Sequence, residues 1–447
     1  MTTLSQLFYL LRYYPGFIDD LFLKSLPCGV IYYSIIFTLP LWLTCNLYLV
    51  GSVLGWILLF WIIYVQFFRP FVLSNDNDVS LRVHWLIVIW TVGALILLVS
   101  LIIGHLDFAL GIPLLIKSTI GWAKGWALFP VYLFVGSALP CLNLISRALC
   151  VLGFFVCLLF PISLFAPILN LPQVLYTGPL LFSPLLSFFD VSLYQIDGVT
   201  GVLRWRLFTP WPTALGMLGN LYFWVCILEN KTKWRIFGIS GCILMILMSK
   251  SRVAVVSILL ILFAYLNIFL IRKIYYLFFL SFASYFLVLL LPKIIGIFNN
   301  LWASIASARA ASTRVRADLA DFALTNWREN AYWWGHGIVV TGPKIVEGMP
   351  IGSHHTWLGL LFVKGSIGFL SFLIPFAAGF LFFLCKCITT DEVKYRTCMA
   401  IFLTLSVYTF SENLEILIYL YWPAIVVLGT CLTQKDATVT ELVLHQD

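Results

Sequence analysis

The chain has 447 residues, of which 62% are hydrophobic and only 10% are charged, and its formal net charge is +8. A soluble fold cannot bury that much apolar surface, and the apolar residues occur in continuous blocks long enough to cross a bilayer. Continuous blocks also exclude a transmembrane β-barrel, whose strands alternate in polarity. We therefore predict an all-α, polytopic membrane protein whose basic residues mark helix ends, not a nucleic-acid surface.

The apolar blocks predict about 12 transmembrane helices. Two lie within 29–68, joined by a turn at 44–46, and the others lie near 83–104, 122–141, 148–169, 213–228, 236–250, 253–271, 274–291, 356–384, 397–411 and 414–432. The chain then divides into three parts: 1–291 with spans one to nine and a loop at about 170–212, a large helical loop at 292–355, and 356–447 with the last three spans and a tail.

Lysine and arginine predict the orientation of these spans. Most of them fall in connections on one side of the membrane: Arg12, Lys24, Arg69, Arg82, Arg147, Lys231, Lys233, Arg235, Arg272, Lys273, Lys386, Lys394 and Arg396. Under the positive-inside rule that side is cytoplasmic. Both termini are then cytoplasmic, and the two large loops face outward.

Three groups of cations do not follow this rule: Arg204 and Arg206 in the first loop, Lys250 and Arg252 between two apolar spans, and Arg309, Arg314, Arg316 and Arg328 in the large loop. Long loops escape the rule, so solvated arginines are one interpretation. Lys250 and Arg252 lie in no such loop, and cations at membrane depth tend to have an anionic partner and a function.

The start of the large loop predicts an amphipathic helix, because apolar residues recur there at helical spacing: Ile305, Ala308, Val315, Leu319, Phe322 and Ala323. Arg309 and Arg316 share one face of this helix, and Arg314 points about 140° away. Neighbouring guanidinium groups suit a phosphate or diphosphate. The alternative is an ordinary surface helix whose arginines pair with Asp318 and Asp321.

His354 and His355 directly precede the tenth span, and His336 lies between two glycines. An imidazole can take a proton from a hydroxyl nucleophile; the alternatives are an interfacial histidine pair and a structural His336. There is no nucleotide-binding loop, and Asp76-Asn77-Asp78 is interpreted as a cytoplasmic turn. We predict no metal and no cofactor, because no His-x-x-x-His pair or carboxylate cluster appears on the outer side. In a transfer from a lipid diphosphate, arginine can stabilise the leaving diphosphate in place of a metal.

Several of these segments resemble the motifs of one family. Gly352-Ser353-His354-His355-Thr356-Trp357-Leu358, followed by Gly365-Ser366-Ile367-Gly368, resembles the Ser-His-Asn-x-aromatic-Leu and Gly-x-x-Gly signature of the O-antigen ligase and polymerase superfamily. Gly335-His336-Gly337 resembles its Gly-x-Gly, and Ser251-Arg252 its Ser-Arg. Arg204-Trp205-Arg206 with Pro212 and Gly216 is similar, more loosely, to its Arg, Pro-Asn and Gly segment. This chain has His355 where the family usually has Asn, and Trp211-Pro212-Thr213 where it has Pro-Asn.

The resemblance implies a glycosyltransferase of the bacterial inner membrane that moves a glycan from undecaprenyl diphosphate to a sugar hydroxyl at the periplasmic face. His354 would activate the hydroxyl, with His355 as the competing candidate, and Arg252 with Arg314 or Arg316 would hold the diphosphate. Arg204, Arg206, Arg309 and His336 are further substrate-binding candidates.

The acceptor separates the members of this superfamily. A polymerase uses a second lipid-linked glycan and a ligase uses lipid A–core oligosaccharide; we favour a polymerase slightly, because nothing marks a lipid A–core site. The implied partners are the lipid bilayer and other polysaccharide-assembly proteins, with no nucleic acid. A lipid-linked glycan flippase and a protein O-oligosaccharyltransferase are the alternatives.

Overall fold

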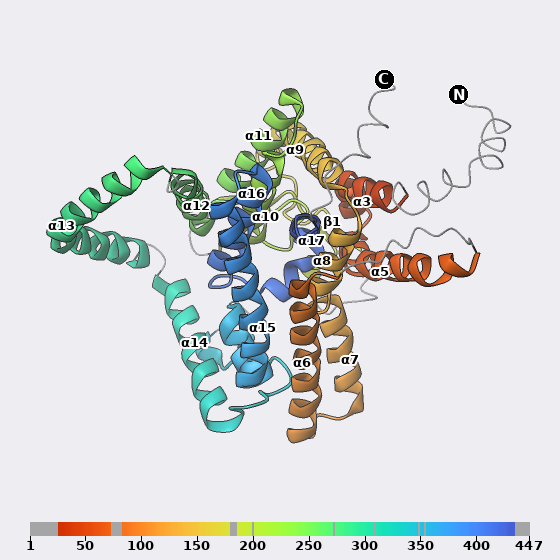
Figure 1. Ribbon diagram of the computed structural model, residues 1–447. Helices are drawn as coiled ribbons and strands as arrows, with labels where there is room; N and C mark the ends of the chain where they lie inside the picture. Colours follow the sequence, from red (N-terminus) through yellow and green to blue (C-terminus); the bar gives the residue numbers. More distant parts are fainter. Residues whose placement is uncertain are drawn as a thin grey trace, which may run out of the picture.

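The computed structural model describes residues 26–72, 83–178, 186–198, 201–270, 273–307, 310–346, 349–352 and 355–433, and these are mostly helical (Figure 1). In chain order the α-helices are α3 (Leu26–Ile36), α4 (Thr38–Leu43), α5 (Leu47–Val72), α6 (Trp85–Asp107), α7 (Ile112–Lys124), α8 (Leu128–Ala138), α9 (Leu142–Phe165), α10 (Pro212–Cys226), α11 (Thr232–Met248), α12 (Arg252–Leu270), α13 (Ile274–Ser307), α14 (Ala310–Asn330), α15 (Thr356–Thr389), α16 (Val393–Tyr408) and α17 (Leu414–Thr430).

Five of the described helices are long and apolar enough to cross a membrane. They are α6, α9 and α15 over their whole lengths, Leu47–Gln66 of α5 and Ile274–Ile297 of α13. Helices α3, α12 and α17 are apolar as well, but shorter. The prediction of a helical membrane protein is thus confirmed, whereas the count of 12 spans stays a prediction. Residues 76–78, predicted to form a cytoplasmic turn, lie outside the described residues.

Helices α8 and α13 differ clearly in length from the apolar blocks that predicted them. The block at 122–141 yields only the 11 residues of α8, because Gly125 separates α7 from α8 and the residue before Pro140 is disfavoured in a helix. The block expected to end at 291 continues as α13 through Pro292 to Ser307. An internal proline bends a helix, and Figure 1 shows α13 bent and projecting from the rest of the chain.

The loop at 170–212 contains two short antiparallel strand pairs. Strand β1 (Tyr176–Thr177) pairs with β2 (Asp190–Val191), and β3 (Tyr194–Ile196) pairs with β4 (Leu203–Trp205). A 3-10 turn, η2 (Leu186–Phe188), lies between β1 and β2. Strand β4 is followed closely by α10, so these pairings help to fix where the first arginines of the candidate site lie.

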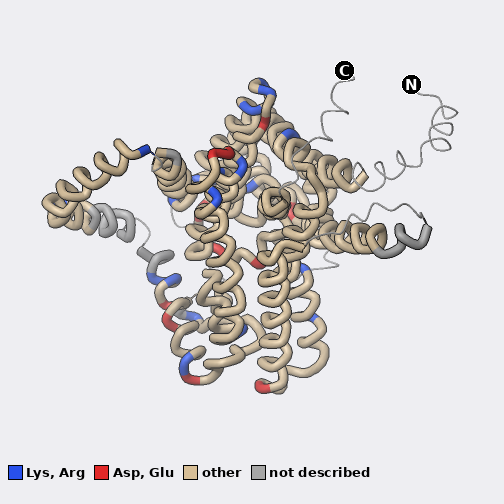
Figure 2. The backbone as a smooth tube through the Cα atoms, in the orientation of Figure 1, with Lys and Arg blue, Asp and Glu red and all other residues tan. Residues whose placement is uncertain are grey.

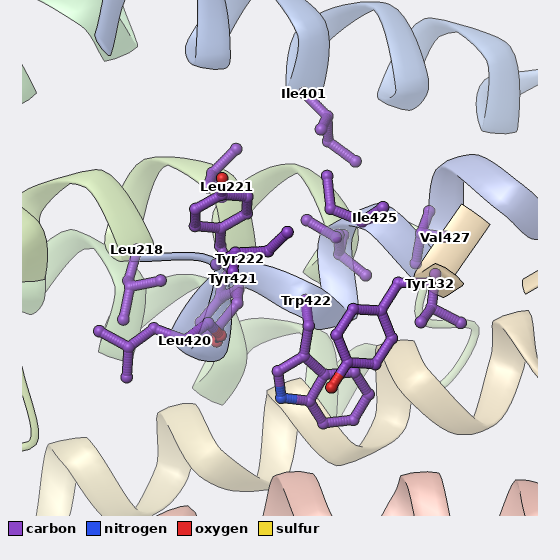
Figure 3. Packing of buried hydrophobic residues seen from close by; sticks show 14 of the residues in the cluster. Tyr132, Leu218, Leu221, Tyr222, Ile401, Leu420, Tyr421, Trp422, Ile425 and Val427 are labelled. Carbon is purple, nitrogen blue, oxygen red and sulfur yellow. The ribbon is translucent and has the colours of Figure 1, made fainter. Parts of the chain in front are cut away.

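Helix α17 lies in the core, and its side chains are buried along almost its whole length. Figure 3 shows side chains of three other helices around it: Tyr132 of α8, Leu218, Leu221 and Tyr222 of α10, and Ile401 of α16. Tyr132 stacks on Trp422 with 5.3 Å between ring centroids. The hydroxyl of Tyr222 donates a hydrogen bond of 2.6 Å to the carbonyl of Leu420. Because α17 is apolar on every side, it has to be surrounded by other helices.

Several of the cations that we predicted to face the cytoplasm, Arg147 and Arg396 among them, lie at one end of the helices. Arg147 of α9 donates hydrogen bonds of 2.8 and 2.6 Å to the buried Glu229, which follows α10. Trp224 stacks on Tyr265 at 5.3 Å, and Arg396 lies 5.5 Å over the same Tyr265 ring. Figure 2 shows Lys and Arg around the adjoining ends of α9 and α11. We call this the basic end. Because Arg396 lies in the first turn of α16, the turn after α16 lies at the opposite end of that helix.

Helix α15 is broken at Gly365, whose φ of 67° lies in the left-handed region. Residues 332–337 fill the break. The N–H groups of His336 and Gly337 donate to the carbonyls of Phe362 and Val363 at 2.9 and 3.0 Å, and the N–H of Ser366 donates to the carbonyl of Tyr332 at 2.9 Å. Backbone groups freed by a broken helix need partners in apolar surroundings. The two glycine motifs, 335–337 and 365–368, therefore form one structural element.

We predict that Gly365→Ala destabilises the protein by more than about 1–2 kcal/mol, the cost of a left-handed conformation for an L-residue alone. The added Cβ would also approach the Trp333 carbonyl oxygen to 2.3 Å. Thermal unfolding in detergent measures the effect. Gly296→Ala in α13 is the matched control, since its Cβ would meet nothing within 4 Å. Equal stability of the two variants would contradict the role assigned to the break.

Candidate functional site

The start of α15 is bound to the turn between α16 and α17. The N–H of Thr356 donates to the Thr409 carbonyl at 2.9 Å, and its hydroxyl donates to the Glu412 carbonyl at 2.7 Å. The same hydroxyl accepts from the N–H of Leu414 at 3.1 Å. The indole of Trp357 donates to the Thr409 hydroxyl at 2.9 Å. The 355–358 segment of the histidine motif is thus fixed against residues 409–414.

Glu412 is the central acidic group of this region. It is only 3% exposed, and its carboxylate accepts a hydrogen bond of 2.9 Å from the indole of Trp211 at the start of α10. Burial raises the pKa of Glu412 above its ordinary value, and the nearby Thr213, Arg316 and Arg204 oppose that rise. Two of the predicted substrate-binding arginines therefore lie within electrostatic range of one buried carboxylate.

Two further predicted segments meet beside this carboxylate. Arg204 donates from Nε to the carbonyl of Ser249 at 3.0 Å, and its Nη1 lies 3.4 Å from Asp197. A Cβ on Gly216 would lie 2.9 Å from the Ser249 hydroxyl, so α10 packs directly on the turn that leads into α12. Arg252 is the first residue of α12 and is exposed. The 204–216 and 249–252 segments are therefore neighbours in space.

Helix α14 brings the arginines of the large loop to the same end. Its residues Val315, Leu319 and Ala323 are buried in a cluster with Phe362 of α15 and Val346. These three belong to the apolar face predicted from the sequence; Ala308 and the side chain of Ile305 lie outside the described part. Arg314 and Arg316 are exposed, and within the described residues neither pairs with Asp318 or Asp321. Their charges are therefore not neutralised on their own helix.

His355 caps α15. Its Nδ1 accepts a hydrogen bond of 3.3 Å from the N–H of Leu358, and its ring meets Phe410 edge-on at 5.5 Å between centroids. Because Nδ1 is the acceptor, the neutral ring carries its proton on Nε2. Burial lowers the pKa of His355 below its ordinary value, which favours this neutral form. The Nδ1 lone pair, which would have to accept the proton in a general base, is therefore occupied by the capping hydrogen bond.

Two of the predicted site residues, His336 and Arg206, make contacts that give them a structural role. His336 stacks between Phe108 and Phe362, at 4.9 and 4.3 Å between centroids, and its Nδ1 lies 3.0 Å from the Phe362 carbonyl. Arg206 is 6% exposed; it donates to the carbonyls of Ser187 and Thr209 at 2.6 and 3.1 Å. Asp190 lies 3.5 Å from Arg206. Both side chains stabilise the segments that carry them.

The remaining candidates are Arg309 and His354, which lie outside the described residues. The described residues hold no group of three His, Cys, Asp or Glu side chains that could bind a metal ion. No protein-family model matches this chain, and the search of curated proteins finds no match to its sequence.

Sequence reasoning did not identify three charged residues at this end: Glu412, Glu415 and Lys364. Each lies within or directly beside an apolar block. An ionisable residue in a membrane-embedded helix is a functional candidate in its own right, and this signal was available for Lys364 and Glu415. Glu412 lies between two predicted spans, where a carboxylate is ordinary; only the fold brings it to the arginines.

We predict that the cap makes stability depend on pH near 6. A folded-state pKa of His355 below its unfolded value means that the unfolded chain binds more protons as pH falls below about 6.5, so this contribution to stability is lost with acidification. His355→Asn replaces the ring with a strong, non-titrating cap. Melting temperatures from pH 5 to 8 should then differ between wild type and variant by up to about 2 °C at the acid end only. A difference that stays constant with pH would contradict the assignment.

Proposed function

We propose that the protein is a metal-independent glycosyltransferase of the bacterial inner membrane that moves a glycan from undecaprenyl diphosphate to a sugar hydroxyl. The observation that carries this proposal is the contact of segments 204–216, 249–252 and 355–358 beside Glu412, with Arg316 within electrostatic range of its carboxylate. Each contains residues selected from the sequence for the same chemistry. They come from four separate parts of the chain, so closeness in the sequence does not explain why they lie near one another in the fold.

The chemistry needs one base and a cationic site. The acceptor hydroxyl oxygen forms a bond to the anomeric carbon of the donor glycan, the bond from that carbon to the diphosphate breaks, and the hydroxyl proton passes to the base. Negative charge then grows on the departing diphosphate, which guanidinium groups stabilise. Arg252, Arg314 and Arg316 are exposed cations at this end. Glu412 is a positioning residue that attracts Arg204 and Arg316.

We assign the base to His354 and the cap to His355. The occupied Nδ1 of His355 supports this division, because a cap cannot also accept a proton without breaking its hydrogen bond. The resembling family usually has Asn at this position, and Asn is among the strongest N-caps. His355 would then cap α15 as Asn does at this position in the family, although the residue type differs.

The proposed topology has 12 spans, with both termini in the cytoplasm and the site facing the periplasm. The separation of the basic end from the candidate site supports it, since cations concentrate on the cytoplasmic side of membrane proteins. Shorter helices such as α8 would then cross the membrane only together with adjoining segments. A slight preference for a polymerase over a ligase rests on the sequence alone.

We expect purified protein to transfer glycan from undecaprenyl-diphosphate oligosaccharide to a second lipid-linked acceptor, equally well with and without EDTA. His354→Ala should lower the rate by about 10²–10⁴-fold, the usual contribution of a general base. His355→Asn should keep the rate within about threefold, as expected for a preserved cap. Gel or mass-spectrometric analysis of the products measures all three.

The controls separate the alternatives. Transfer to lipid A–core would indicate a ligase, and transfer to a protein hydroxyl would indicate an O-oligosaccharyltransferase. Movement of the lipid-linked glycan across vesicles without covalent transfer would indicate a flippase. Full activity of His354→Ala, or loss of activity with EDTA, would contradict the proposed mechanism.

A further inference from the structure

A cavity of about 340 Å³ lies between α6, α7, α15 and α17, beside the candidate site. Its volume is within the range of small-molecule sites, about 300–1,000 Å³. Gly337, Gly352 and Gly359 line the cavity, with Gly352 and Gly359 packed closely against each other, and Trp126, Leu101 and Leu360 form apolar walls. Thr356 lines it too, and the same residue binds the turn that carries Glu412.

Lys364 is the most unusual residue of this cavity. It is only 4% exposed and lines the space, yet within the described residues no ion pair or hydrogen bond holds its ammonium group. It lies within electrostatic range of Glu415. A buried cation is costly unless it is paired, so a lysine kept at such a place points to an anionic partner.

The charges around the cavity leave a surplus. Lys117 and Lys364 contribute two positive charges, and Glu415 contributes one negative charge, so the lining carries one uncompensated positive charge. Glu415 lies within electrostatic range of Lys364, but no ion pair joins the two side chains in the described part of the chain. Glu415 therefore does not fully satisfy Lys364, and the cavity favours a ligand with a single anionic group.

We propose that this cavity binds a sugar that carries one anionic group, a carboxylate or a phosphate. The apolar walls match the carbon face of a pyranose ring, and the few polar groups match its hydroxyls and its charge. Lys364 contacts the anion, with Lys117 contributing from the rim. Resting on the proposed function, we assign this ligand to the acceptor glycan. The reason is that Thr356 lines the cavity and is also the first residue of α15, in the candidate site.

Binding of glucuronic acid, glucose 6-phosphate, glucose and inorganic phosphate to the full chain in nanodiscs tests this site without any transfer assay. Saturation-transfer NMR and calorimetry should detect one or both acidic sugars, with glucose and phosphate alone at least on the order of tenfold weaker. Lys364→Met removes the charge at similar volume and should weaken binding by at least about tenfold. Glu415→Gln removes the opposing charge and should leave binding equal or stronger.

Lys124→Met is the matched control, because Lys124 is on α7 but does not line the cavity and lies 5.2 Å over the Tyr48 ring. It should bind like the wild type. Equal binding of glucose and glucuronic acid, binding unchanged by Lys364→Met, or no binding of either acidic sugar would overturn the proposal. Acidic-sugar binding that persists in a protein without transferase activity would preserve the site and reject the proposed function alone.

Discussion

The attachment of the start of α15 to the turn between α16 and α17 is the constraint on which the candidate site depends. Thr356 makes three hydrogen bonds to this turn, and Trp357 adds a fourth. Glu412, held in the same turn, accepts a hydrogen bond from Trp211, the N-cap residue of α10. Side chains that are far apart in sequence are thereby fixed at one end of the helices. Because the Glu412 carboxylate is buried, removing its partners would leave it without hydrogen bonds in an apolar region.

The break in α15 is the second requirement. An unbroken helix would leave no place for residues 332–337, whose N–H groups satisfy the carbonyls before Gly365. The stacking of His336 between two phenylalanine rings closes this junction and holds α14 and its arginines near α15. Lys364, directly before the break, lines the cavity from the same element. One interruption of a helix thus positions both the large loop and the cavity wall.

Much of this fold follows from the sequence, because hydropathy reports directly on which segments leave water. Most of the helices, the turn at 44–46 and the apolar face of α14 were predictable on that basis. The short α8 and the long α13 were not, since hydropathy alone does not report that Gly125 and Pro140 limit α8 or that α13 continues through Pro292. The site was predictable only in part. Arg204, Ser251-Arg252 and the histidines have local signatures, whereas Glu412 has none and acquires its partners only through tertiary contacts.

The contact between Glu412 and Trp211 is the most direct measure of whether the site is assembled as described. A double-mutant cycle of Glu412→Ala and Trp211→Phe, followed by thermal unfolding in detergent and by the transfer rate, isolates it. We expect a coupling free energy of about 1–3 kcal/mol in stability, as for a buried hydrogen bond to a charged group. Additive effects, within about 0.5 kcal/mol, would contradict the account, because α10 and the α16–α17 turn would then not be joined through this carboxylate.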